Sequence, residues 1–199
     1  MEKLIFLFIL LIISIVIVSL EEVKVIYATV PQHTTLFESS MFLEVIEPEE
    51  IAYLYRIRPA RNFGEDFPYL FHGIDLTPAL PYHACSPLTN SETVRGGVAL
   101  VERGGCSFVT KTLNVEEAGA LAILIADNDH TNDHSYIDMI QDDTEREPTI
   151  PSLFMLGKDG FVIKQTLDKL NLESALINIP VNVTGIPLPK IHRPPWTLW

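Results

Sequence analysis

The chain is poor in basic residues, and this scarcity excludes several classes of partner. Its 199 residues include 14 basic and 26 acidic side chains, which gives a formal net charge of −12. Proteins that bind nucleic acids or anionic membrane surfaces need Lys and Arg to neutralise phosphates. We therefore expect neither a nucleic acid nor an anionic membrane surface as a partner.

The sequence motifs of common catalytic sites are also absent. The chain contains no G-x-S-x-G elbow, no H-E-x-x-H helix, no P-loop and no G-x-G-x-x-G turn. The polar stretch Asp127–Glu147 could supply a pair of carboxylates, but hydrated carboxylates there would make poor general acids. The sequence therefore predicts that the protein is not an enzyme and uses no cofactor.

No apolar run reaches the roughly 20 residues that a membrane-spanning helix needs. The longest run, Leu4–Val18, is interrupted only by Ser14 and follows Lys3. Its length is typical of the core of a signal peptide, so we predict that residues 1–19 are removed after Ser19. An uncleaved signal anchor is the alternative, and both interpretations place the rest of the chain in the secretory lumen or outside the cell. We expect no stable membrane insertion after cleavage.

Cysteine is nearly absent, since Cys85 and Cys106 are the only two. In an oxidising compartment such a pair favours a disulfide. Two thiols cannot complete a structural zinc site, and the chain has no C-x-x-C redox motif. Closing this loop would stabilise the fold by about 3 kcal/mol in the chain-entropy model.

The centre of the chain has the pattern of a βαβ unit. Val98–Val101 and Ala120–Ala126 are apolar runs of strand length, and Phe108–Ala118 between them has helical spacing. Ser107 can cap this helix, and Gly119 can end it in a left-handed conformation. We therefore predict two parallel strands covered on both faces.

The remainder is predicted to be β-rich with one further helix. The helix is expected at Phe161–Leu170, after a turn at Gly157–Gly160. The additional strands are expected at Val23–Ala28, Met41–Ile46, Ile51–Ile57, Ile150–Leu156 and Ala175–Val183.

The turn of the βαβ unit carries a family resemblance. Arg103–Phe108 reads R-G-G-C-S-F, and it is followed by Lys111, Asn114 and Ala118–Ala120. This pattern resembles the protease-associated (PA) domain, a module of sorting receptors, membrane ubiquitin ligases and several proteases. The resemblance covers residues 85–182 of this chain. It implies an α/β, β-rich fold, namely an open β-barrel or sandwich with flanking helices and a central βαβ unit.

On this basis we predict one PA domain at residues 20–184, followed by a Pro- and Trp-rich tail at residues 185–199. The tail either packs across the domain or offers a docking peptide, and packing is the simpler interpretation. Asn182 lies in the only N-x-[ST] sequence, so we predict an N-glycan there, which a gel shift after N-glycosidase treatment would test.

The most polar stretch, Asp127–Glu147, offers a possible metal site. An EF-hand loop starting at Asp127 would lack the acid and the glycine required at its fifth and sixth positions. His130 and His134 would lie on the same face only if this segment were helical, and the sequence identifies no third zinc ligand. We therefore predict a solvated loop that binds no metal.

The resemblance also implies a binding surface, because sorting receptors hold cargo beside the corresponding loop. The candidate partner-binding residues are Glu102, Arg103, Asn128, Asp129 and His130. They follow two predicted parallel strands, whose carboxyl ends meet at one edge of the sheet. Arg103 has a structural alternative, since its guanidinium could instead bind carbonyls of the turn that follows it.

Together these observations predict a secreted, non-catalytic PA-domain glycoprotein that binds an unidentified protein or peptide. The alternative is an accessory or regulatory subunit of a separate protease. The two hypotheses differ in the partner that should copurify with the protein.

The first prediction concerns entry into the secretory pathway. Because the apolar segment is short, N-terminal sequencing of protein from the culture medium should begin at Leu20. Membrane-bound protein that retains Met1 would show a signal anchor instead.

Overall fold

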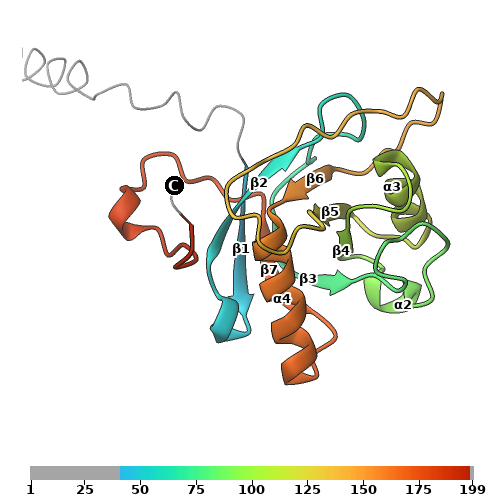
Figure 1. The fold of residues 1–199 in the computed structure, drawn as a ribbon. Helices are drawn as coiled ribbons and strands as arrows, with labels where there is room; N and C mark the ends of the chain where they lie inside the picture. The colour runs from blue at the N-terminus through green and yellow to red at the C-terminus, as the bar shows by residue number, and fades with distance from the viewer. Residues whose placement is uncertain (1–40, 198–199) are drawn as a thin grey trace, which may run out of the picture. The chain divides into compact units, whose positions relative to one another are not determined.

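The computed structural model describes residues 41–197, whose strands form a barrel (Figure 1). The strands are β1 (Met41–Glu47), β2 (Leu54–Pro59), β3 (Phe71–Pro78), β4 (Val98–Glu102), β5 (Ala122–Ala126), β6 (Ser152–Met155) and β7 (Ala175–Ile179). The helices are η1 (Glu49–Ile51), α2 (Ser91–Val94), α3 (Phe108–Glu117), α4 (Gly157–Leu170) and η2 (Leu188–Lys190). The predicted segment 1–19 and the predicted strand Val23–Ala28 lie outside the described residues.

The strands are arranged in the order β1-β2-β6-β5-β4-β3-β7, and β1 pairs with both β2 and β7. The β-rich barrel predicted from the sequence is thereby confirmed, and its strands close completely rather than leaving the open edge that we expected. β3, β4, β5 and β6 run parallel to one another, whereas β1 and β7 pair only with antiparallel neighbours. The parallel pairing of β4 with β5 confirms the predicted βαβ unit.

Strands β4 and β5 are buried on both faces, as their apolar sequences predict. Leu100 and Leu124 belong to a core that draws side chains from all of the barrel strands. Val101 and Ile125 point into a second core, where α3 contributes Val115. The helix α3 therefore covers the outside of the barrel at the place where the candidate site begins.

Several elements differ from the sequence prediction. The helices η1 and α2 were not expected, and β7 ends at Ile179 rather than at Val183. β3 was not identified, because Gly73, at φ +61°, and a register shift between His72 and Ile74 interrupt its alternation. Gly157–Gly160, predicted as a turn, forms the first turn of α4. A Cβ atom on Gly157 would lie 2.0 Å from the Asp129 carbonyl oxygen, so this glycine is needed for close packing rather than for a turn.

The proline-rich tail packs against the domain up to residue 197. The backbone N–H of Leu54 donates a hydrogen bond to the His192 carbonyl at 2.7 Å, and the indole N–H of Trp196 donates to Asp159 Oδ1 at 2.7 Å. The ring of Tyr53 contacts both His192 and Trp196. Asn182, where the chain leaves the barrel, is exposed. No helix within residues 41–197 has the length and apolar character needed to cross a bilayer.

The buried contact between tail and helix yields a pH prediction. Asp159 is 1% exposed, and burial raises the pKa of its carboxyl to about 6, although the hydrogen bond from Trp196 partly opposes the shift. Between pH about 4 and about 6, Asp159 is therefore protonated in the folded state and ionised in the unfolded state. Its contribution to the free energy of unfolding falls as the pH rises through that window. Asp159→Asn keeps the Oδ1 acceptor and removes the titration.

We therefore expect Asp159→Asn to gain stability relative to wild type between pH about 4 and 7, by up to about 3 kcal/mol. Urea unfolding at several pH values measures this difference. Asp66→Asn, at an exposed site, serves as the matched control. Parallel stability curves for wild type and Asp159→Asn would show that this carboxyl does not titrate as described.

Candidate functional site

The site begins at the turn between β4 and α3. Gly104 and Gly105 have φ values of +102° and +83°, a region that side chains disfavour, and this allows the sharp turn. Ser107 then caps α3, because its hydroxyl accepts a hydrogen bond from the Thr110 N–H at 3.1 Å, as predicted. The turn is therefore fixed at its helical end by a local hydrogen bond.

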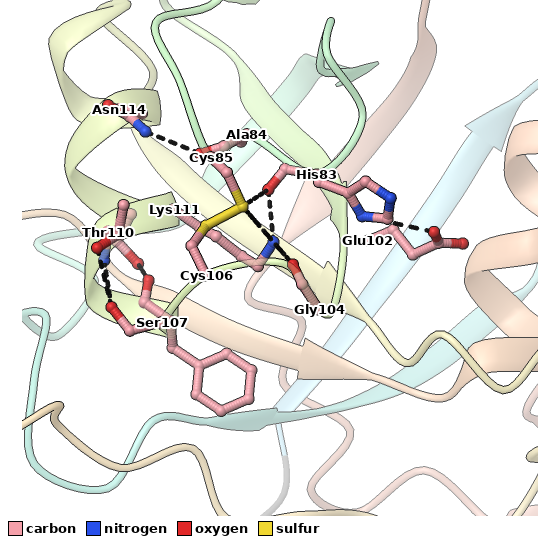
Figure 2. The surroundings of a disulfide bond; sticks show 12 residues. His83, Ala84, Cys85, Glu102, Gly104, Cys106, Ser107, Thr110, Lys111 and Asn114 are labelled. Atoms are coloured by element: carbon pink, nitrogen blue, oxygen red, sulfur yellow. Dashed lines mark hydrogen bonds and ion pairs between the residues drawn. A yellow bond between two sulfur atoms is a disulfide. The ribbon is translucent and has the colours of Figure 1, made fainter.

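A disulfide joins this turn to the segment after β3. The predicted bond between Cys85 and Cys106 is present, with the two Cα atoms 5.7 Å apart. Figure 2 shows Lys111 of α3 directly beneath it, with Nζ donating to the carbonyls of His83 at 2.5 Å and Gly104 at 2.6 Å. One ammonium group therefore binds the two segments that the disulfide also joins.

Lys111 is fully buried, which sequence reasoning missed because lysine is ordinarily exposed. Burial lowers the pKa of its ammonium to about 8, while the charge of Glu102 acts in the opposite direction. The two carbonyl acceptors replace part of the lost hydration. The signal in the sequence was the place of Lys111 in the pattern that carries the family resemblance.

Arg103 forms an ion pair with Asp127 at the ends of β4 and β5. Its Nη1 lies 2.9 Å from Asp127 Oδ1, and Asp127 is 5% exposed. Asp127 also accepts hydrogen bonds from the Asn128 N–H and from the Asn132 side-chain amide. The structural role considered for Arg103 is therefore real, although its partner is a carboxylate rather than the carbonyls of the turn.

The other candidate residues lie around this pair. His130 Nε2 lies 2.8 Å from Glu102 Oε1, and His83 Nδ1 lies 3.6 Å from Glu102 Oε2. The carboxylate of Asp129 accepts hydrogen bonds from Thr131, and these hydrogen bonds lower its pKa. The structure brings together the candidate residues that follow β4 and those that follow β5, with Asn128, Asp129 and His130 exposed.

A pocket of about 210 Å³ adjoins these residues. It adds three side chains that sequence reasoning did not include, namely Tyr82, Phe161 and Lys164. The ring of Phe161 stacks on His130, with centroids 4.5 Å apart. An aromatic residue on the polar face of a predicted helix was the signal that could have identified Phe161.

The acidic stretch, residues 127–147, is held to the rest of the domain by ion pairs, whereas we predicted a solvated loop. Asp138 pairs with Arg58 at 3.1 Å, and Asp133 pairs with Lys158 at 3.3 Å. His134 pairs with Asp133 and not with His130, so the considered histidine pair does not form. Among residues 41–197, no three His, Cys, Asp or Glu side chains are placed to hold a metal ion together.

The fold and the turn sequence identify a class of protein. A sequence model of the PA domain matches residues 74–163. The PRADC1-like protein of Drosophila melanogaster is 43% identical to this chain over 166 residues, which make up 82% of this chain and 85% of that protein. The chain therefore belongs to the PA domain family, and the resemblance seen in the sequence is confirmed.

Other relatives share only the domain. The ER degradation-enhancing alpha-mannosidase-like protein 3 of Homo sapiens is 34% identical over 87 residues, which are 42% of this chain and 9% of that protein. Among solved structures, an aminopeptidase from Aneurinibacillus sp. strain AM-1 has a TM-score of 0.50 at 15% identity, covering 71% of this chain and 30% of that one. At this identity the likeness shows the fold alone.

The buried ammonium yields a stability prediction. Lys111→Met keeps most of the side-chain volume but leaves two carbonyls without their donor, so it should lower the free energy of unfolding by about 1–3 kcal/mol. The matched control is Lys169→Met, at an exposed position of α4. Urea unfolding of the two variants measures the difference. Equal midpoints would show that the Lys111 ammonium does not hold the two segments.

Proposed function

We propose that the protein is a non-catalytic interaction module of the secretory pathway, which binds a protein or peptide at the ends of β4 and β5. The observation that carries this proposal is a preorganised, charged surface. Glu102, Arg103 and the loop 128–130 are supported by a disulfide, a buried lysine and an ion pair. Preorganisation lowers the entropy cost of binding.

Four features support placement in the secretory pathway. The segment 4–18 has the length of a signal-peptide core, and the disulfide is typical of oxidising compartments. Asn182 is exposed, as an N-glycan acceptor must be. A relative at 34% identity is named for ER degradation, which suggests the same compartment for this domain.

The absence of a catalytic role is part of the proposal. A general acid or base needs a titratable group free to exchange a proton with substrate. At the strand ends, Asp127 is already occupied by Arg103 and Asn132. The likeness to an aminopeptidase covers 30% of that enzyme, so it carries no activity over to this chain.

A second function, as an accessory subunit of a separate protease, is favoured by the names of some relatives. An aminopeptidase of Pseudomonas aeruginosa (strain UCBPP-PA14) is 32% identical over 73 residues, which are 14% of that protein. The signal peptide peptidase-like 2 of Arabidopsis thaliana matches over 102 residues. In this hypothesis the barrel would contact an enzyme rather than cargo.

Cross-linking followed by affinity purification from secreting cells tests both functions. A protease as the main stoichiometric partner supports the accessory role, and a different protein supports the interaction module. With the captured partner, Asp129→Asn and Asn128→Arg should each weaken binding by about tenfold, the scale of a well-placed interface residue. Both side chains are exposed, so the fold should tolerate these changes.

Glu117→Gln, at an exposed position of α3, is the control for Asp129→Asn because it removes the same charge. Circular dichroism establishes that each variant is folded. If the partner binds both site variants as tightly as it binds the control, the binding surface lies elsewhere on the domain.

A further inference from the structure

The pocket beside the site has walls suited to a long side chain. Tyr82 and Phe161 supply aromatic surface, Ala126 is apolar, and the volume is about 210 Å³. Phe161 is 36% exposed. A pocket of this size and composition accommodates one extended side chain rather than a whole ligand molecule.

Most charges that line the pocket already have partners. Lys164 Nζ lies 2.7 Å and 2.5 Å from the two carboxylate oxygens of Asp168, and Asp127 is paired with Arg103. Burial and the charges of Glu102 and Asp168 raise the pKa of Tyr82, so its hydroxyl stays neutral. The remaining charge in the pocket is the carboxylate of Glu102.

Glu102 has one oxygen available to a ligand. Its Oε1 is within hydrogen-bonding distance of His130, but its Oε2 accepts no hydrogen bond from residues 41–197. The nearest ionisable nitrogen, His83 Nδ1, is 3.6 Å from Oε2. The carboxylate is therefore flanked by two imidazoles.

We propose that this pocket binds a basic side chain, Lys or Arg, of the protein partner through Glu102. This inference rests on the proposed function, because it names the chemistry that the same surface recognises. The ligand's cation would donate to Glu102 Oε2, and its aliphatic stem would lie along Phe161 and Tyr82.

Charge complementarity favours a basic ligand over an acidic one. The chain carries a net charge of −12, which would attract cationic segments and repel anionic ones. A carboxylate in the pocket would face Glu102 directly, and Lys164 is already paired with Asp168. A cationic side chain could instead bind Glu102 Oε2 without breaking an existing ion pair.

Nuclear magnetic resonance titration of the isotope-labelled full chain tests the pocket without a known partner. The probes are N-acetyl-arginine amide, its uncharged analogue N-acetyl-citrulline amide, and N-acetyl-glutamate amide. At pH about 7.4 the arginine probe should shift the amides of Glu102, His130 and Phe161 and bind about tenfold more tightly than the citrulline probe, the effect of one charge-assisted hydrogen bond.

Glu102→Gln should remove this preference, and Glu117→Gln should keep it. Equal binding of arginine and citrulline probes, preferential binding of the glutamate probe, or shifts confined to other residues would overturn the inference.

The outcome is separable from that of the proposed function. If a captured partner depends on Asp129 while the arginine probe does not bind, the interaction surface stands and the basic-side-chain pocket is wrong. If the probe binds as described while the partner ignores the site variants, the pocket exists but the partner uses another surface.

Discussion

The buried ammonium of Lys111 is the interaction on which the candidate site depends. It binds the carbonyl of His83 on one segment and that of Gly104 on the other, and the Cys85–Cys106 disulfide joins the same two segments covalently. A charge buried in this way is stable only while its acceptors are in place, so the two loops are held in a single arrangement. Glu102 and His83 owe their proximity to that arrangement.

The second half of the site is fixed by packing rather than by charge. The loop after β5 lies against the first turn of α4, where a Cβ atom on Gly160 would come within 2.3 Å of Ala126 Cβ. This close approach brings Phe161 next to His130. Because β4 and β5 are parallel, both halves emerge at the same edge of the barrel. The two halves of the site therefore form one surface.

The sequence predicted the parts of the structure that depend on local signals. The Ser107 cap, the end of α3 at Gly119 and the two apolar strands are all short-range patterns. It missed features set by distant partners. Lys111 is buried because two loops supply carbonyls to it, residue 157 must be glycine because the Asp129 carbonyl lies against it, and Asp138 is paired because Arg58 reaches it from β2. Such contacts leave no periodicity in the sequence.

Amide hydrogen exchange of the protein with and without its captured partner tests the central claim most directly, because it reports protection residue by residue. The account predicts that binding slows exchange at residues 102–105 and 127–131, with little change across the groove of about 830 Å³ formed by residues 60–68, 141 and 147–149. Protection confined to that groove, or to the tail at residues 191–197, would contradict the assignment of the binding surface to the ends of β4 and β5.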